Sequence, residues 1–127
     1  MVHHLLYYCS TNPNAVIRYK PSNMILKVSP DASYLSEPKA QSRCGGHFYL
    51  GTKPVQKYTK NSPLLNTTNV IHTVVTSAAE VEYASLYMNT KTATPLRHTL
   101  MELGHTHPST PIQSDNTTAV GLANDTI

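Results

Sequence analysis

A change of pattern near residue 76 constrains the fold more than any other feature of the sequence. In the segment TSAAEVEYASLYMNTKTA (76–93), Ser77 precedes Glu80 by three residues, the spacing of a capping box at a helix N-terminus. Pro95 should kink or interrupt this helix, and PLRHTLMEL should resume it until Gly104 ends it. A long helix between strand-like segments predicts a strand–helix–strand crossover.

Short apolar segments on both sides of this helix are typical of β-strands. The strands expected before it are AVIRY (15–19), MILKV (24–28), RCGGHFYLG (43–51) and extended chain within PLLNTTNVIHTVV (63–75). Residues 2–9 should form one or two helical turns, and residues 52–62 a basic loop. After the long helix we expect a short strand at IQS (112–114) and a last helix that starts within TAVGLAN (118–124). This order of elements predicts an α/β fold.

Length and composition indicate one domain of ordinary globular type. The chain has 127 residues, of which 39% are hydrophobic and 13% charged. Cys9 and Cys44 lack CxxC spacing, so neither a zinc site nor a disulfide framework is indicated, and an intracellular location is the default expectation. HHLLYYC is too short for a membrane span or for the apolar core of a secretory signal, so we expect neither membrane association nor secretion.

Basic residues are concentrated in one part of the chain. The net charge is only +3, but no acidic residue lies between Pro38 and Ala79. The basic residues of that interval are Lys39, Arg43, Lys53, Lys57 and Lys60. Such a segment suits a polyanionic partner such as nucleic acid, and a solvated loop is an equally weighted alternative.

Three of the 7 acidic residues occupy positions that suit a metal site. Asp31 follows the strand expected at 24–28, Glu82 lies in the first turns of the long helix, and Asp115 ends the strand after that helix. If the two strands are parallel neighbours, both Asp carboxylates emerge at one edge of the sheet. The crossover helix can place a third carboxylate at the same point. Gathered carboxylates repel one another unless a divalent cation neutralises them, and hard oxygen ligands suit magnesium.

Two glutamates compete for the helical position in this site. Glu80 and Glu82 point about 200° apart on a helix, so only one of them can face the sheet. Glu80 already has a structural role in the capping box with Ser77, which leaves Glu82 as the candidate ligand. For Asp115 the plain alternative is a turn or helix-cap residue.

Four segments, in this order and spacing, resemble the RNase H region of copia-type retrotransposon polyproteins. They are SPDASYLSEPKAQSRCGGHFYLG, TSAAEVEYASL, RHTLMELGH and IQSDNTTAVGLAN. In that family an Asp-containing strand is followed by an SxSGY-like strand, an SSTEAEY-like helix start and a DNxSA-like strand end. Their counterparts here are Asp31, residues 42–48, residues 77–83 and residues 115–119. The resemblance implies an RNase H-like mixed sheet over residues 23–127, preceded by a connecting segment at 1–22.

The resemblance also implies an activity, namely metal-dependent hydrolysis of the RNA strand of an RNA–DNA hybrid. The first three metal-binding acids of the family correspond to Asp31, Glu82 and Asp115, which would bind Mg²⁺ or Mn²⁺, as a pair of ions in the intact family domain. Asn116, within the DNxSA-like match, joins the basic residues as a candidate nucleic-acid contact.

Two departures from the family pattern stand out. The family's fourth acid lies beyond the last match and is not reached before Ile127, so we expect the domain to be C-terminally incomplete. Pro30 occupies a position where the family has a small polar residue, and it predicts local distortion beside Asp31.

Two other functions remain open. A non-catalytic fragment could keep the fold and bind nucleic acid through residues 39–60. A metal protein could use His98, His105 and His107, although the loop around the last two favours solvent-exposed histidines. Tyr83 and Tyr87 could stack on bases, but a pair of this kind is more often part of a core.

Overall fold

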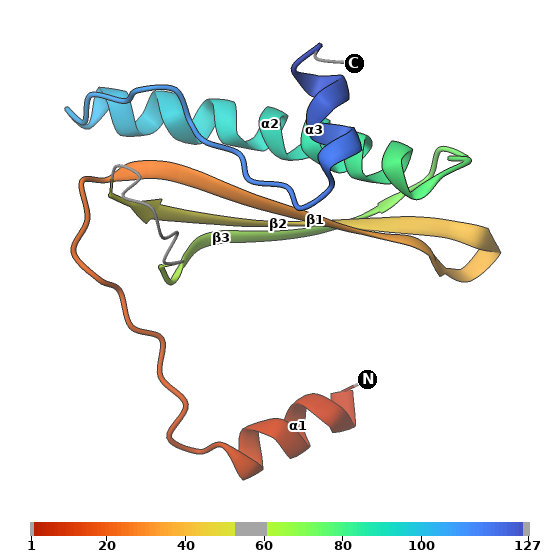
Figure 1. Cartoon of the computed structure of the whole chain (residues 1–127). Coiled ribbons are helices and arrows are strands. Elements are labelled where there is room, and N and C mark those ends of the chain that lie inside the picture. Colours follow the sequence, from red (N-terminus) through yellow and green to blue (C-terminus); the bar gives the residue numbers. More distant parts are fainter. Residues whose placement is uncertain (1, 53–60, 126–127) are drawn as a thin grey trace.

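The computed structural model describes residues 2–52 and 61–125 as a mixed α/β arrangement built on a three-stranded antiparallel sheet (Figure 1). The strands, in the order β1-β2-β3, are β1 (Ile25–Glu37), β2 (Gln41–Gly51) and β3 (Pro63–Ile71). The helices are α1 (Val2–Thr11), α2 (Ala78–Glu102) and α3 (Thr117–Ala123), and a 3-10 turn, η1 (Pro38–Ala40), joins β1 to β2. Figure 1 shows α2 and α3 on one side of the sheet, whereas α1 lies apart from it and buries none of its residues.

Strand β1 is longer than the sequence pattern predicts. It pairs with β2 in unbroken register from Ile25 to Ser33, so Asp31 lies inside the strand and not after it. The distortion expected from Pro30 is absent from this pairing. Backbone N–H groups of successive residues point to opposite edges of a strand, so those of residues two apart point to the same edge. The Val28 N–H points to Pro111, away from β2, and the nitrogen of Pro30 therefore points away from β2 as well. The ladder between β1 and β2 therefore loses no hydrogen bond at Pro30.

The segment after α2 returns to the free edge of β1. The Val28 N–H donates to the Pro111 carbonyl (3.1 Å), and the Gln113 N–H donates to the Val28 carbonyl (2.9 Å). These bonds form an isolated parallel bridge between Val28 and Ile112, so the strand expected at 112–114 is reduced to a single bridge. Helix α2 thus carries the chain from β3 across the sheet to the far side of β1, as the expected crossover requires.

Helix α2 begins where the capping box predicts. The Ser77 hydroxyl accepts a hydrogen bond from the Glu80 N–H (3.2 Å), and the Glu80 carboxylate accepts bonds from the Thr76 N–H (2.7 Å) and hydroxyl (2.9 Å). Its end is also as expected, since Gly104 has a positive φ of 90° that favours glycine.

The expected interruption of α2 at Pro95 is wrong, because the helix runs through Pro95 to Glu102. A helical proline removes one backbone hydrogen bond. Ala93 and Leu100, on either side of it, are buried in one core cluster, which holds both halves of the helix against the sheet.

The core consists of two apolar clusters, with polar groups between them. Leu26, Val28, Phe48, Ala93 and Leu100 form the larger cluster, and Cys44, Ile71 and Val81 form the smaller one. Along α2, the buried residues between Val81 and Ala93 are Glu82, Ser85 and Asn89. The face of α2 that meets the sheet therefore changes from apolar to polar and back.

Residues 15–19 do not form the expected strand. They lie in irregular, exposed chain, with Val16, Ile17 and Tyr19 open to solvent. Side-chain hydrogen bonds hold this region in place: the Tyr19 hydroxyl donates to the Pro63 carbonyl (3.0 Å), and the Lys20 N–H donates to Asn61 Oδ1 (2.9 Å).

Several other expectations concern the rest of the chain. The N-terminal helix is present as α1, and both cysteines are free thiols. Most of the basic loop, residues 53–60, lies outside the described residues. Of the helices in residues 2–52 and 61–125, none combines the length and the apolar character needed to cross a bilayer.

Candidate active site

Asp31 and Asp115 lie beside one another because of the parallel bridge between Val28 and Ile112. Each Asp comes three residues after a bridge partner (28 to 31 and 112 to 115), in two segments that run in the same direction. Both residues line an open hollow of about 320 Å³ together with Ser29, Pro30, Gln113 and Ser114. The parallel neighbours expected from the sequence are therefore present, although Asp31 is not at the end of its strand.

Glu82 reaches this region from α2 and is almost buried, with 9% of its surface exposed. Burial raises the pKa of its carboxyl group, and the charges of Asp115 and Asp31 raise it further, while a backbone hydrogen bond from Ala32 opposes them. Its Oε2 atom has no hydrogen-bond partner among the described residues. The three predicted acids therefore lie within electrostatic reach of one another, with one buried oxygen unpaired.

The three carboxylates offer hard oxygen ligands, which suit a hard divalent cation. Within residues 2–52 and 61–125, no group of three or more His, Cys, Asp or Glu side chains is arranged to hold a metal ion. Magnesium, however, keeps several of its waters and binds proteins through one or two carboxylates, not through a complete protein cage. Two exposed aspartates and an unpaired glutamate oxygen fit that mode of binding.

Glu80 has the structural role assigned to it. Hydrogen bonds from the backbone and side chain of Thr76 lower the pKa of the Glu80 carboxyl group. These bonds hold it at the start of α2, and Glu82 is the one that approaches the sheet.

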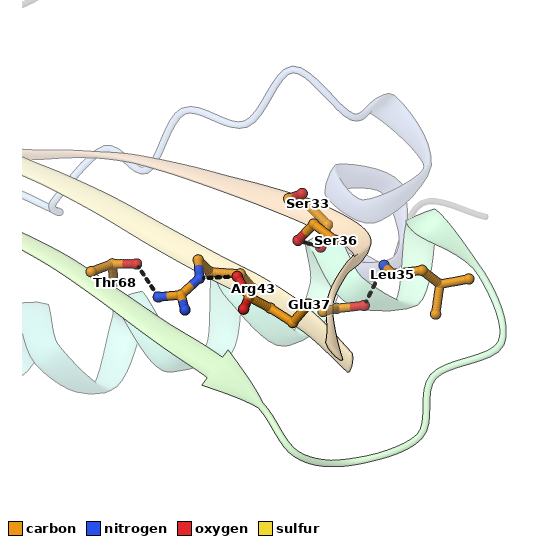
Figure 2. A network of polar contacts seen from close by, with 7 residues as sticks. Ser33, Leu35, Ser36, Glu37, Arg43 and Thr68 are labelled. Atoms are coloured by element: carbon orange, nitrogen blue, oxygen red, sulfur yellow. Dashed lines mark hydrogen bonds and ion pairs between the residues drawn. The ribbon is translucent and has the colours of Figure 1, made fainter. Parts of the chain in front are cut away.

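Two candidate nucleic-acid contacts have structural partners. Figure 2 shows Arg43 between Glu37 and Thr68: its Nε donates to Glu37 Oε1 (2.5 Å) and its Nη1 to Thr68 Oγ1 (3.0 Å). The Arg43 guanidinium lowers the pKa of Glu37, so the positive charge of Arg43 is largely balanced. Asn116 caps α3, since its Oδ1 accepts a hydrogen bond from the Ala119 N–H (2.9 Å). The helix-cap role considered for Asp115 thus belongs to its neighbour.

The remaining candidate contacts are lysines. Lys39 is exposed in η1 at the tip of the β1–β2 hairpin, where a phosphate group can reach it. Lys53, Lys57 and Lys60 lie outside the described residues, and their role stays a prediction.

His105 and His107 are less exposed than expected, whereas His98 is exposed. Both ring nitrogens of His107 are buried and have no hydrogen-bond partner among the described residues. Burial lowers the pKa of His107, and the nearby charges of Arg97 and His105 lower it further. A metal site built on His98, His105 and His107 finds no support in the part of the chain that the structure describes.

The two tyrosines of α2 lie on its outer face and not in the core. Tyr83 is 46% exposed and Tyr87 is 63% exposed. The Lys91 ammonium lies 5.6 Å from the centre of the Tyr87 ring. Contact with a partner through these rings therefore remains open, whereas a core role is wrong.

Sequence reasoning missed two buried polar residues beside the acids, Ser85 and Asn89. The Ser85 hydroxyl donates to the Asp31 carbonyl (3.1 Å), and Asn89 Nδ2 donates to the Gly45 carbonyl (3.0 Å). A signal for them exists in the sequence, because Glu82, Ser85 and Asn89 recur at helical spacing and so share one face of α2. Paired glycines in β2 are the complementary signal for close approach of another backbone.

Comparisons with protein-family models, with curated proteins and with solved structures each found no match to this chain. The resemblance to the RNase H region of copia-type polyproteins therefore stays a prediction based on the four sequence segments.

Proposed function

We propose that this chain is an RNase H-like domain of copia-type retrotransposon origin that acts on the RNA strand of an RNA–DNA hybrid. In this proposal Asp31, Glu82 and Asp115 bind magnesium or manganese. The observation that carries it is the parallel bridge between Val28 and Ile112, which brings two aspartates to one hollow within electrostatic reach of a buried glutamate.

The order of the elements supports this assignment. Three antiparallel strands are followed by a crossover helix and by a segment that pairs in parallel with the first strand. A mixed sheet with a strand–helix–strand crossover is the arrangement that the sequence resemblance implies. The proposal treats residues 23–127 as this domain and residues 1–22 as a connecting segment, and it includes an intracellular location.

Each acid has a distinct part in the proposal. Asp31 and Asp115 would hold the ion from the sheet side, where both side chains are exposed. Glu82 would hold it from the helix side, which would give its unpaired oxygen a partner. A bound divalent ion would neutralise the gathered carboxylates and polarise an oxygen of the phosphodiester.

Magnesium titration by calorimetry tests the metal site directly. We expect the wild-type chain to bind Mg²⁺ and Asp115→Asn to bind it at least tenfold more weakly, since a ligand is removed. Glu102→Gln is the matched control, because Glu102 is an exposed acid at the far end of α2. Absence of Mg²⁺ binding in the wild type, or equal affinity in Asp115→Asn, would contradict the proposal.

Cleavage of a labelled RNA–DNA hybrid separates a nuclease from the second candidate, a non-catalytic hybrid-binding domain. That candidate is favoured by one observation: no trio of ligand residues in the described part of the chain is arranged to hold a metal. Metal-dependent loss of the RNA strand that disappears in Asp115→Asn supports the nuclease. Hybrid binding without cleavage supports the second candidate.

The salt dependence of hybrid binding locates the binding surface. Neutralising Lys53, Lys57 and Lys60 together should flatten the plot of log affinity against log salt, by about one unit for each phosphate that the protein no longer neutralises. Arg43→Gln should change that slope much less, because Glu37 already balances its charge. An unchanged slope in the triple variant would point to another surface.

A further inference from the structure

Two hydrogen bonds from buried side chains tie α2 to one rung of the β1–β2 ladder. Asp31 and Gly45 are direct cross-strand partners. Ser85 donates its hydroxyl to the carbonyl of Asp31, and Asn89 donates its amide to the carbonyl of Gly45. The helix is thus attached to both strands at the rung that carries a predicted metal ligand.

The two helical residues also bond to each other and are inaccessible to solvent. Ser85 is 0% exposed and Asn89 is 2% exposed. Asn89 Nδ2 donates to the Ser85 carbonyl (2.8 Å) and lies 3.3 Å from the Ser85 hydroxyl. Both donors would be left without their partners if α2 moved along the sheet, and an unpartnered buried polar group is costly. The pair therefore opposes sliding of the helix.

A glycine makes this contact possible. A Cβ atom on Gly46 would lie 1.7 Å from Asn89 Oδ1, a distance that no packing tolerates. The absence of a side chain at Gly46 leaves room for Asn89, whose amide reaches the neighbouring Gly45 carbonyl. The close approach of α2 to the sheet therefore depends on both elements: Asn89 supplies the amide and Gly46 supplies the space.

We propose that Ser85 and Asn89 are positioning residues that set the location of Asp31 relative to Glu82. They touch neither metal nor substrate. Glu82 precedes Ser85 by three residues on the same face of α2. A hydrogen bond that holds Ser85 at Asp31 therefore also sets the position of Glu82 relative to Asp31. The catalytic part of this inference rests on the proposed function, whereas the anchoring of the rung does not.

The test compares Mg²⁺ affinity in Ser85→Ala with that in two controls. Residues that orient metal ligands typically change affinity by about 10-fold or more when removed, so Ser85→Ala should weaken binding about tenfold. Thr90→Ala removes an exposed hydroxyl whose hydrogen bond stays within its own helix (2.8 Å to the Leu86 carbonyl) and should leave affinity unchanged. Leu100→Val, a core variant of lower stability, should also leave the affinity of the folded chain unchanged.

A double-mutant cycle separates positioning from general destabilisation. If Ser85 acts through Asp31, the effect of Ser85→Ala should vanish in an Asp31→Asn background. Equal effects of Ser85→Ala in both backgrounds, or no effect in the wild type, would overturn the inference. If Ser85→Ala does not fold, Ser85→Cys keeps a weak donor of similar size and should give a smaller loss in the same direction.

Amide hydrogen exchange decides the inference independently of the metal. In Ser85→Ala, exchange should accelerate at Asp31 and Gly45 relative to the β2–β3 ladder, and in Thr90→Ala it should not. If the wild type fails to bind Mg²⁺ but Ser85→Ala shows this local acceleration, the proposed function is rejected and the anchoring role is retained. Unchanged exchange at this rung would overturn the anchoring role itself.

Discussion

The two halves of α2 meet the same sheet in different ways. The second half places Ala93 and Leu100 into an apolar cluster with Leu26, Val28 and Phe48. The first half places the polar side chains of Glu82, Ser85 and Asn89 toward the sheet. Val81, Ala84 and Met88 flank them in the smaller apolar cluster. Burial of the apolar half removes carbon surface from water, which is the main favourable contribution to folding.

The polar half gains much less from burial. Its hydrogen bonds largely replace bonds to water, and one oxygen of Glu82 has no bond at all among the described residues. A helix face that gains little from burial and lies near three carboxylates fits the proposed metal site, because function is commonly obtained at the expense of local stability. The difference between the halves suggests that stability and metal affinity can be changed separately.

The largest expected effect is on stability, from Leu100→Ala in the apolar half. Removing most of a buried leucine side chain should lower the free energy of unfolding by about 3 kcal/mol. The Mg²⁺ affinity of the chain that remains folded should not change, since Leu100 lies two turns or more beyond the polar residues. Urea denaturation and calorimetry below the transition check the two quantities. A parallel loss of affinity would show that the halves of α2 are not separable.

Glu82→Gln should have the opposite pattern. The substitution removes a charge from a buried site near two other carboxylates, so the metal-free protein should become more stable by about 1 kcal/mol. Mg²⁺ affinity should fall by at least tenfold because a charged ligand is removed. Thermal unfolding with and without Mg²⁺ measures both effects. A variant that binds Mg²⁺ as well as the wild type would remove Glu82 from the site.

The raised pKa of Glu82 also predicts a pH dependence of stability. The folded state holds the proton of Glu82 more tightly than the unfolded state, because of burial and the charges of Asp115 and Asp31. The contribution of Glu82 to stability is therefore complete below its unfolded pKa and is lost as pH rises through its folded pKa. As pH rises from the unfolded pKa of Glu82 through its folded pKa, the difference in unfolding free energy between the wild type and Glu82→Gln should grow. Saturating Mg²⁺ should reduce this difference. A difference that is constant with pH would contradict the raised pKa.

The sequence predicts most of the fold where local rules decide it. The start of α2 follows from Ser77 and Glu80, and its end from Gly104, because capping depends on residues within one turn. The failures occur where tertiary contacts decide. Pro95 does not break the helix because buried residues hold both sides of it. Residues 15–19 look like a strand but pair with no strand among the described residues.

The acidic residues of the candidate site can be predicted from the sequence, but the residues that hold them in place cannot. Asp31, Glu82 and Asp115 can be selected because acidic residues are few and their positions along the elements suggest convergence. The roles of Ser85 and Asn89 depend on which rung of the sheet lies under α2, and that register is a tertiary property. The pairing of Arg43 with Glu37 depends in the same way on the geometry of the β1–β2 hairpin.

The smallest expected effects come from the capping residues Ser77 and Glu80, which are not among the buried residues of either half. Ser77→Ala removes the hydroxyl that accepts the Glu80 N–H and should lower stability by about 1 kcal/mol, the usual effect of removing an N-cap. Glu80→Ala should lower stability less, because its carboxylate is exposed and bonds to Thr76 and Ser77 beside it in the chain. Since hydrogen bonding lowers the pKa of Glu80, its contribution to stability is present above its unfolded pKa and is lost as pH falls through its folded pKa.

Both variants should bind Mg²⁺ like the wild type, so titrations of Glu80→Ala and Glu82→Gln side by side give the sharpest contrast on one helix. A loss of Mg²⁺ affinity in Glu80→Ala equal to that in Glu82→Gln would mean that the position of the whole helix end, and not one carboxylate, controls the site.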